Sequence, residues 1–248
     1  MRLFDANVYF GSHAGAVYPA ASIADLQAAF EKTETTRALV WHITQQSGAP
    51  RDANALVAET VAEHDNLLGC WAVLPPQTSE VSVEGIFEQM RAGRIAALRA
   101  FPNAQHFLLR RRVFGSFLDE VSQRRIPVLL SLEHGVDWPD VYAFLEDYPE
   151  ITCILCDIGD WGQDRFTWPL LEGFPRVYVE TSYASLEAGG IEATVGRYGA
   201  GRLVYGSGFP KRYPEAAMLD LLRAQLTEHE RDMIAFGNLS ALVEETQL

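Results

Sequence analysis

Two side chains that could exchange protons with a substrate lie at the ends of apolar runs in the sequence. Asp157 ends one such run, and His134 follows another. A carboxylate in apolar surroundings has a shifted pKa, and an imidazole titrates near a pH of about 6.5. We therefore predict Asp157 and His134 as the catalytic acid–base pair. A structural alternative stays open for each, since Asp157 could pair with Arg99 or loop amides and His134 could cap a loop.

Other polar residues at the ends of apolar runs could position a substrate. Arg99 is a cation that can bind a carboxylate through two parallel hydrogen bonds, although a salt bridge with Asp5 or Asp157 is the alternative. Residues two apart on a strand share a face, so Asp5, Asn7 and Tyr9 are expected to point the same way. The predicted substrate-binding residues are Asn7, Tyr9, Arg99, Ser131, Glu133 and Glu180.

Several carboxylates among these positions could in principle form an oxygen-rich cation site. Mg²⁺ and Mn²⁺ prefer oxygen ligands, and the available groups are Asp5, Glu133, Asp157 and Glu180. No spacing in the sequence requires such a site, so it stays a minor hypothesis. The Cys153-Ile154-Leu155-Cys156 segment falls within an apolar run, where residues three apart face opposite ways. We interpret its cysteines as structural.

Alternating apolar and amphipathic stretches indicate the elements that must position these side chains. Short apolar runs bounded by Gly, Pro, Asp or Asn are typical of strands, and the longer stretches between them are typical of helices. One helix is expected to begin after Ser22, which is suited to cap it, and another is expected over 112–125. The predicted strands are Leu3–Phe10, Ala38–Thr44, Leu67–Leu74, Ile95–Phe101, Pro127–Leu132, Thr152–Ile158, Val177–Thr181 and Leu203–Ser207.

Eight strands, each followed by a helix, predict an α/β fold of the (β/α)8 TIM-barrel type, as a single domain over residues 1–248. Strands that are apolar almost throughout suit a parallel sheet buried on both faces. An open doubly wound sheet is the competing fold, but no Gly-x-Gly-x-x-Gly or P-loop lysine motif occurs. In a barrel, the site lies at the C-terminal ends of the strands, where the candidate residues fall.

The composition limits the kinds of partner. The 248 residues include 20 basic and 33 acidic side chains, which gives a formal net charge of −13. Such an acidic surface repels phosphate backbones and anionic lipids, which argues against nucleic acid and membrane partners. Three cysteines are too few for a disulfide framework, and no apolar run reaches the ~18 residues of a membrane span. We expect a cytoplasmic protein that binds a small-molecule ligand.

Read in order, the strand segments resemble the amidohydrolase superfamily, and most closely its branch of aromatic-acid decarboxylases and small lactonases. The segment 3–11 is similar to that family's first strand, which carries Asp and then His-x-His. The segment 203–210 is similar to its eighth, which normally reads Gly-Ser-Asp-aromatic-Pro. Further similar segments are 126–131, 154–159 and 177–182, together with Gly237-Asn238 and Leu242 of the closing helix. The resemblance implies the barrel fold over the whole chain.

At the positions where the resemblance places the metal centre, this sequence has other residue types. The family binds a divalent metal through two His of the first strand, a His of the fifth and an Asp of the eighth, with a sixth-strand His beside the metal-bound water. The residues here are Asn7, Tyr9, Ser131, Asp157 and Gly208. A catalytic zinc needs about three protein ligands, and Gly offers no side chain. We therefore expect that the family's Zn or Mn is lost and that the protein has no cofactor.

The resemblance implies hydrolysis of a small organic ester, lactone or amide. We predict such a hydrolase with a rebuilt, metal-independent site. The alternative is a catalytically inactive family member that acts as a ligand-binding or assembly subunit. A third interpretation, ranked last, keeps a metal through Asp157, Glu133 or His134. The resemblance also implies a homodimer, because the family commonly pairs its barrels.

Overall fold

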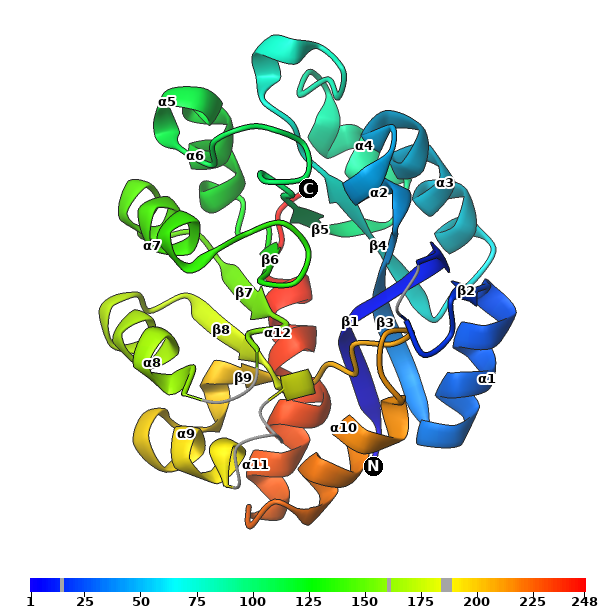
Figure 1. The fold of residues 1–248 in the computed structure, drawn as a ribbon, viewed down its shortest axis with the longest axis vertical. Helices are drawn as coiled ribbons and strands as arrows, with labels where there is room; N and C mark the ends of the chain where they lie inside the picture. The colour runs from blue at the N-terminus through cyan, green and yellow to red at the C-terminus, as the bar shows by residue number, and fades with distance from the viewer. Residues whose placement is uncertain (14–15, 160–161, 184–188) are drawn as a thin grey trace.

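The computed structural model describes residues 1–13, 16–159, 162–183 and 189–248 (Figure 1). Its centre is a sheet of nine strands in the order β2-β1-β3-β4-β5-β6-β7-β8-β9. Neighbouring strands pair in parallel, except that β1 and β2 are antiparallel. The strands are β1 Leu3–Ser12, β2 Ala20–Ala21, β3 Thr35–His42, β4 Leu67–Ala72, β5 Ile95–Arg99, β6 Val128–Ser131, β7 Cys153–Cys156, β8 Val177–Glu180 and β9 Leu203–Val204.

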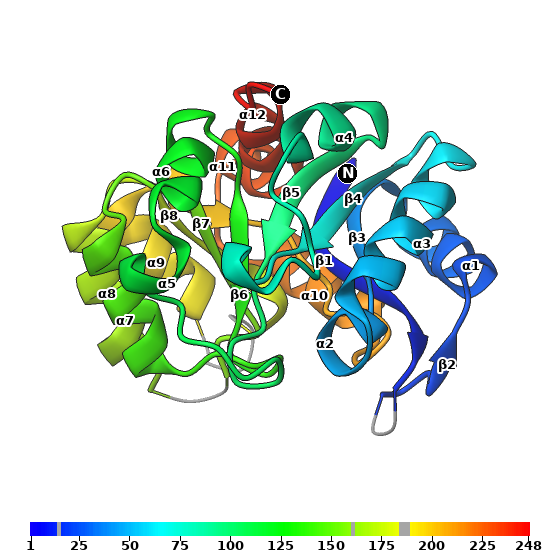
Figure 2. The same cartoon turned by 90° about the horizontal axis from the view of Figure 1, so that it is seen from above.

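Backbone hydrogen bonds between β1 and the segment that continues from β9 close this sheet. Ala6 N donates to Tyr205 O over 2.9 Å, and Tyr9 N donates to Phe209 O over 3.1 Å. The eight parallel strands therefore form a nearly closed barrel with helices around it (Figures 1 and 2). The predicted (β/α)8 TIM barrel is confirmed, and each predicted strand overlaps one strand of the structure.

Helices follow the strands and cover the outside of the barrel. Ser22 caps the first one as expected, because its hydroxyl accepts from Asp25 N while the Asp25 carboxylate accepts from Ser22 N. The helix expected over 112–125 is two helices, divided at Gly115, whose φ of 54° interrupts the helical backbone. The α-helices are α1 Ile23–Thr33, α2 Thr44–Ser47, α3 Pro50–Ala62, α4 Ile86–Ala92, α5 Arg111–Phe114, α6 Ser116–Gln123, α7 Trp138–Asp147, α8 Asp164–Gly173, α9 Gly190–Tyr198, α10 Pro214–Arg223, α11 Glu228–Asp232 and α12 Asn238–Glu244.

The apolar core has two parts, one on each side of the strands. Between strands and helices, side chains such as Val8 of β1 and Leu26 of α1 form the larger cluster. Inside the barrel, Phe4 and Val204 pack with Leu239 of α12, which covers the N-terminal end. This packing fills the lower barrel and leaves its C-terminal end to polar residues. Among the described residues, the helices are too short or too polar to cross a membrane.

Candidate functional site

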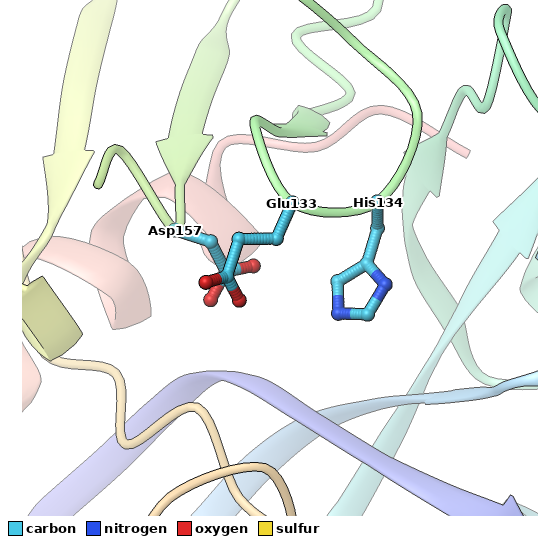
Figure 3. Close-up of side chains that lie close together, drawn as sticks. All are labelled: Glu133, His134 and Asp157. Atoms are coloured by element: carbon cyan, nitrogen blue, oxygen red, sulfur yellow. The ribbon is translucent and has the colours of Figure 1, made fainter. Parts of the chain in front are cut away.

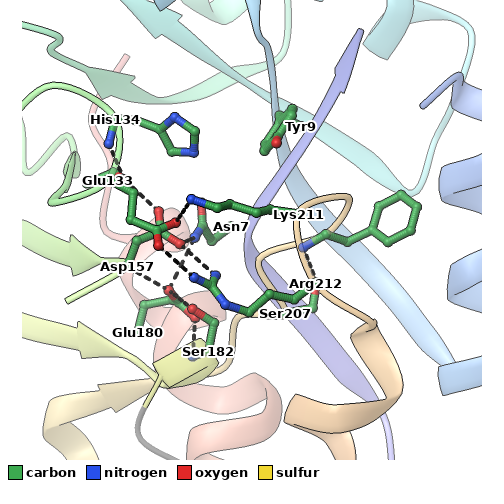
Figure 4. Close-up of polar contacts among 12 residues, drawn as sticks. Asn7, Tyr9, Glu133, His134, Asp157, Glu180, Ser182, Ser207, Lys211 and Arg212 are labelled. Carbon is green, nitrogen blue, oxygen red and sulfur yellow. Dashed lines mark hydrogen bonds and ion pairs between the residues drawn. The ribbon is translucent and has the colours of Figure 1, made fainter. Parts of the chain in front are cut away.

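The structure brings the predicted site residues together at the C-terminal ends of the strands. Figure 4 shows the side chains of Asn7, Tyr9, Glu133, His134, Asp157 and Glu180 pointing into one region from segments that are far apart in sequence. Asn7 and Tyr9 come from β1, Arg99 from β5, Ser131 from β6 and Glu180 from β8, while Asp157 follows β7 and Glu133 and His134 follow β6.

Asp157 is at the centre of this polar group, with only 3% of its surface exposed. It accepts hydrogen bonds from Asn7 Nδ2 over 3.0 Å and from Ser131 Oγ over 2.6 Å, and it lies 3.2 Å from Arg212 Nη1. Burial alone would raise its pKa, but His134, the Ser131 hydroxyl and Arg212 together lower the pKa of Asp157. Its backbone has a φ of 51°, a strained conformation for a residue other than glycine that is common at functional sites. Asp157 is therefore an ionised carboxylate in a buried and strained position.

Glu180 is a second buried carboxyl group next to Asp157. Burial, followed by the nearby charge of Asp157, raises the pKa of Glu180 to about 8. Ser182 donates to it through both its backbone N and its hydroxyl. A Cβ atom added at Gly206 would lie 2.3 Å from Glu180 Oε1, so only glycine leaves room for this side chain. Glu180 therefore adjoins Asp157 without exposed surface of its own.

Asn7 links the two carboxyl groups to the guanidinium of Arg99. Its Nδ2 donates to Asp157 Oδ1 and to Glu180 Oε2, over 3.0 and 3.2 Å, while its Oδ1 accepts from Arg99 Nη2 over 2.8 Å. Arg99 is fully buried and lies over the Trp41 ring, 4.9 Å from the centroid. Within the described part of the chain it forms no ion pair, and neither alternative partner, Asp5 or Asp157, binds it directly. Arg99 therefore holds the side chain of Asn7 in place through the hydrogen bond to its Oδ1.

Asp5 does not share the row of Asn7 and Tyr9, contrary to the expectation from strand alternation. The pairing of β1 with β3 shifts register between Asp5 and Val8, which changes the faces on which successive residues lie. The Asp5 carboxylate accepts from the backbone N of Asn7 and of Ser207 instead. It joins β1 to the segment after β9 and is absent from the group around Asp157.

His134 borders the site on the side of β1 and β3. Burial lowers the pKa of His134 to about 4, so its imidazole is neutral at pH 7. Its Nδ1 lies 2.9 Å from Gln46 Oε1. With this oxygen as acceptor, Nδ1 carries the proton and Nε2 keeps its lone pair. The Tyr9 hydroxyl, 2.8 Å from His13 Nδ1, stays protonated because burial and Asp157 raise the pKa of Tyr9 to about 12.

Two cations from the loop after β9 bind Glu133, and one of them, Arg212, also contacts Asp157; the sequence analysis missed both. Lys211 Nζ lies 2.7 Å from Glu133 Oε2, and Arg212 Nη2 lies 3.0 Å from Glu133 Oε1. The side chains of Glu133 and Arg212 are each 20% exposed, so this layer faces the barrel mouth. A signal was present, because Lys211 is one of only two lysines in the sequence and follows the segment that ends in Phe209-Pro210.

Glu133, His134 and Asp157 form a candidate metal centre. A ligand atom from each lies within 4.8 Å of the other two (Figure 3). Two carboxylates and a neutral imidazole are donors that suit Zn²⁺ and Mn²⁺. The contact between His134 Nδ1 and Gln46 turns Nε2 into a free donor, as second-shell partners of ligating histidines do. The donor set therefore fits a divalent metal.

A (β/α)8 barrel in which carboxylates and an imidazole meet at the C-terminal strand ends has the arrangement typical of barrel enzymes. The sequence matches the amidohydrolase family over residues 7–238, and the chain belongs to this family. No curated protein sequence matches it.

Solved structures with the same fold come from several bacteria. An uncharacterised TIM-barrel protein from Bordetella bronchiseptica has a TM-score of 0.79 and 14% identity, with 99% of each chain covered. A dihydroxybenzoic acid decarboxylase from Polaromonas sp. JS666, with bound manganese and the inhibitor 2-nitroresorcinol, has a TM-score of 0.76 and 13% identity over 98% of this chain and 96% of the other. A probable 2-pyrone-4,6-dicarboxylic acid hydrolase from Acinetobacter baumannii, with citric acid bound, has a TM-score of 0.74 and 14% identity. The match covers 98% of this chain and 100% of the other.

The prediction that the metal is lost and that the protein has no cofactor is wrong. Glu133, His134 and Asp157 lie together as a candidate metal site, and the similar Polaromonas decarboxylase holds manganese. The prediction failed because it gave most weight to the family's usual ligand positions and ranked last the interpretation that keeps a metal through Asp157, Glu133 or His134. Glu133 and His134 lie two and three residues beyond Ser131, on a loop whose course the sequence does not show.

Proposed function

We propose that the protein hydrolyses a small organic ester, lactone or amide that carries a carboxylate. The observation behind this proposal is the meeting of Glu133, His134 and Asp157 beneath the cations Lys211 and Arg212 at the barrel mouth. The names of similar structures support the substrate class. Dihydroxybenzoic acid and 2-pyrone-4,6-dicarboxylic acid both carry carboxylates, and a 2-pyrone is a lactone.

The protonation states of the site residues suit hydrolysis. His134 is neutral at pH 7 and keeps a lone pair on Nε2, so it can accept a proton from an attacking water. Asp157 is ionised and can orient the same water through a hydrogen bond. The Tyr9 hydroxyl stays protonated and can donate to an oxygen of the substrate. Asn7 and Ser131 hold the Asp157 carboxylate in place by hydrogen bonds.

Glu133, His134 and Asp157 are the residues that would hold a divalent metal in this family member. Such a metal supplies Lewis acidity when bound. The roles of His134 as base and of Asp157 as orienting group apply to the site without metal, because a lone pair that binds a metal cannot accept a proton; the role of Tyr9 does not depend on the metal.

The test is turnover of a panel of lactones, esters and amides of small carboxylic acids, with and without added Mn²⁺. We expect at least one substrate to be hydrolysed. Asp157→Asn and His134→Gln should each lower its kcat by about 10²–10⁴-fold, the usual share of an acid–base group. The matched control is Gln123→Glu, which changes one exposed amide at the end of α6, next to Arg124, whose backbone O accepts from Gln247 near the C-terminus, and should leave kcat unchanged.

Two results would contradict the proposal. Turnover that survives both Asp157→Asn and His134→Gln would place the chemistry elsewhere in the molecule. Release of CO₂ from an aromatic acid, without hydrolysis of any compound in the panel, would replace hydrolysis by decarboxylation.

A further inference from the structure

Two of the three candidate metal ligands already bind cations of the protein itself. Lys211 Nζ and Arg212 Nη2 bind the two oxygens of Glu133, over 2.7 and 3.0 Å. Arg212 Nη1 also lies 3.2 Å from Asp157 Oδ1. Figure 4 shows both side chains reaching from the loop after β9 across the mouth toward these carboxylates. The charges of the two carboxylates are therefore balanced by an ammonium and a guanidinium group.

The position of Arg212 depends on the glycine four residues before it. The backbone N of Lys211 and of Arg212 both contact Gly208 O, over 3.0 and 3.2 Å, which makes a tight turn. A Cβ atom added at Gly208 would lie 2.5 Å from Arg212 Nη1. The guanidinium thus occupies the space that a side chain at position 208 would take. The turn and the missing side chain together direct Arg212 onto Asp157.

We propose that Lys211 and Arg212 are resident counter-cations that a divalent metal displaces from Glu133 and Asp157, and that the displaced pair then binds the carboxylate of the substrate. This inference rests on the proposed function, because it concerns the same site. Two carboxylates balance two positive side chains, but they cannot also balance a dication at the same oxygens without strong repulsion between the cations. Metal entry therefore moves the two side chains away from these oxygens.

The displaced cations account for recognition of a carboxylate substrate. Lys211 and Arg212 are on one short loop at the mouth, with side chains 30% and 20% exposed, so an incoming anion can reach both. Arginine binds a carboxylate through two parallel hydrogen bonds, and lysine adds a point charge. Metal binding and carboxylate binding are then coupled, and each strengthens the other by the same factor.

The first experiment measures Mn²⁺ binding by isothermal titration calorimetry, without any substrate. In the double variant Lys211→Gln/Arg212→Gln the competing cations are absent, and the Mn²⁺ dissociation constant should fall about tenfold or more. The matched control is Lys32→Gln/Arg223→Gln, which removes the only other lysine and an exposed arginine of α10. Its Mn²⁺ affinity should stay within about twofold of the unaltered protein, because salt screens distant surface charges.

The second experiment uses the unaltered protein, so it does not depend on folding of the variant. Benzoate serves as the carboxylate probe, and its affinity should rise about tenfold when Mn²⁺ is present, as two-site coupling predicts. An increase in benzoate affinity of the same size in Lys211→Gln/Arg212→Gln would show that the carboxylate binds the metal directly. That result would refute the binding of the substrate carboxylate by Lys211 and Arg212.

Failure of this inference is distinguishable from failure of the proposed function. Equal Mn²⁺ affinity in the unaltered protein and in Lys211→Gln/Arg212→Gln would overturn the proposed displacement of the two cations by a metal, even if the protein hydrolyses a substrate. Absence of Mn²⁺ binding from both would overturn it as well. Conversely, competition between Mn²⁺ and the two side chains would stand if no hydrolysis were found, since both readouts are binding constants.

Discussion

Replacing Asn7 by aspartate tests whether the buried polar network stabilises the barrel as its geometry implies. The substitution keeps the shape of the side chain and the oxygen that accepts from Arg99. It changes the donor Nδ2 into an oxygen that faces Asp157 Oδ1 at 3.0 Å and Glu180 Oε2 at 3.2 Å. Two donated hydrogen bonds are lost, and the new oxygen faces the ionised carboxylate of Asp157.

The size of the effect follows from these two contacts. A hydrogen bond to a charged group contributes about 1.5–3 kcal/mol, and one to a neutral group contributes about 0.5–1.5 kcal/mol. At pH 7 Asp157 is ionised and Glu180, with a pKa of about 8, is mostly protonated. Asn7→Asp should therefore lower the free energy of unfolding by about 2–4.5 kcal/mol, a large part of the stability of an ordinary domain.

The assay is urea unfolding followed by tryptophan fluorescence at pH 7. Asn103→Asp makes the same chemical change at an exposed position and should shift the free energy of unfolding by no more than about 0.5 kcal/mol. An Asn7→Asp protein as stable as the Asn103→Asp control would refute the reasoning. It would mean that Asn7 does not donate to the two buried carboxyl groups in solution.

Two further predictions concern Glu180. Its pKa of about 8 lies above the ordinary value of 4.5, so the stability from its buried protonated form is complete below about pH 4.5 and is lost as pH rises to about 8. When the pH is raised from about 6.5 to about 8, the thermal midpoint of the unaltered protein should therefore decrease, and that of Glu180→Gln should decrease less. An equal decrease of the midpoint with pH in both proteins would contradict this prediction. Gly206→Ala sets a methyl group 2.3 Å from Glu180 Oε1 and should cost about 1–3 kcal/mol in urea unfolding, whereas Gly173→Ala, with nothing within 4 Å, should change little.

The fold could be predicted because barrel strands leave a clear pattern in sequence. Each strand is buried on both faces and is therefore apolar nearly throughout, as in the run from Val128 to Ser131. Turn residues bound these runs, and the order of the segments matches the amidohydrolase pattern. Sites of such barrels lie at the C-terminal ends of the strands, which predicts Asn7, Ser131 and Asp157 at one end of the barrel. In the structure Asn7 and Ser131 both donate hydrogen bonds to Asp157.

What could not be predicted depends on loops and on irregular backbone. Strand alternation put Asp5 beside Asn7, but a register shift within β1 breaks the alternation, and no residue type marks that shift. Lys211 and Arg212 reach across the barrel through long side chains on a turn. Their partner Glu133 is 78 residues away from Lys211 in sequence. Single-sequence patterns describe neighbours along the chain, so they contain no information on such a contact.

Gly208 and Arg212 are best understood as two parts of one change in the site. Where the family has an aspartate after its eighth strand, this chain has a glycine, and the guanidinium of Arg212 fills the space beside it. The charge at this corner of the barrel is thus positive instead of negative. A metal centre has no side chain to use at position 208, so the available donors are Glu133, His134 and Asp157, and Arg212 contacts two of them from that corner. The sequence shows the missing aspartate, and it offered Asp157, Glu133 or His134 as metal ligands only in the interpretation ranked last, because a sequence contains no distances between residues of different loops.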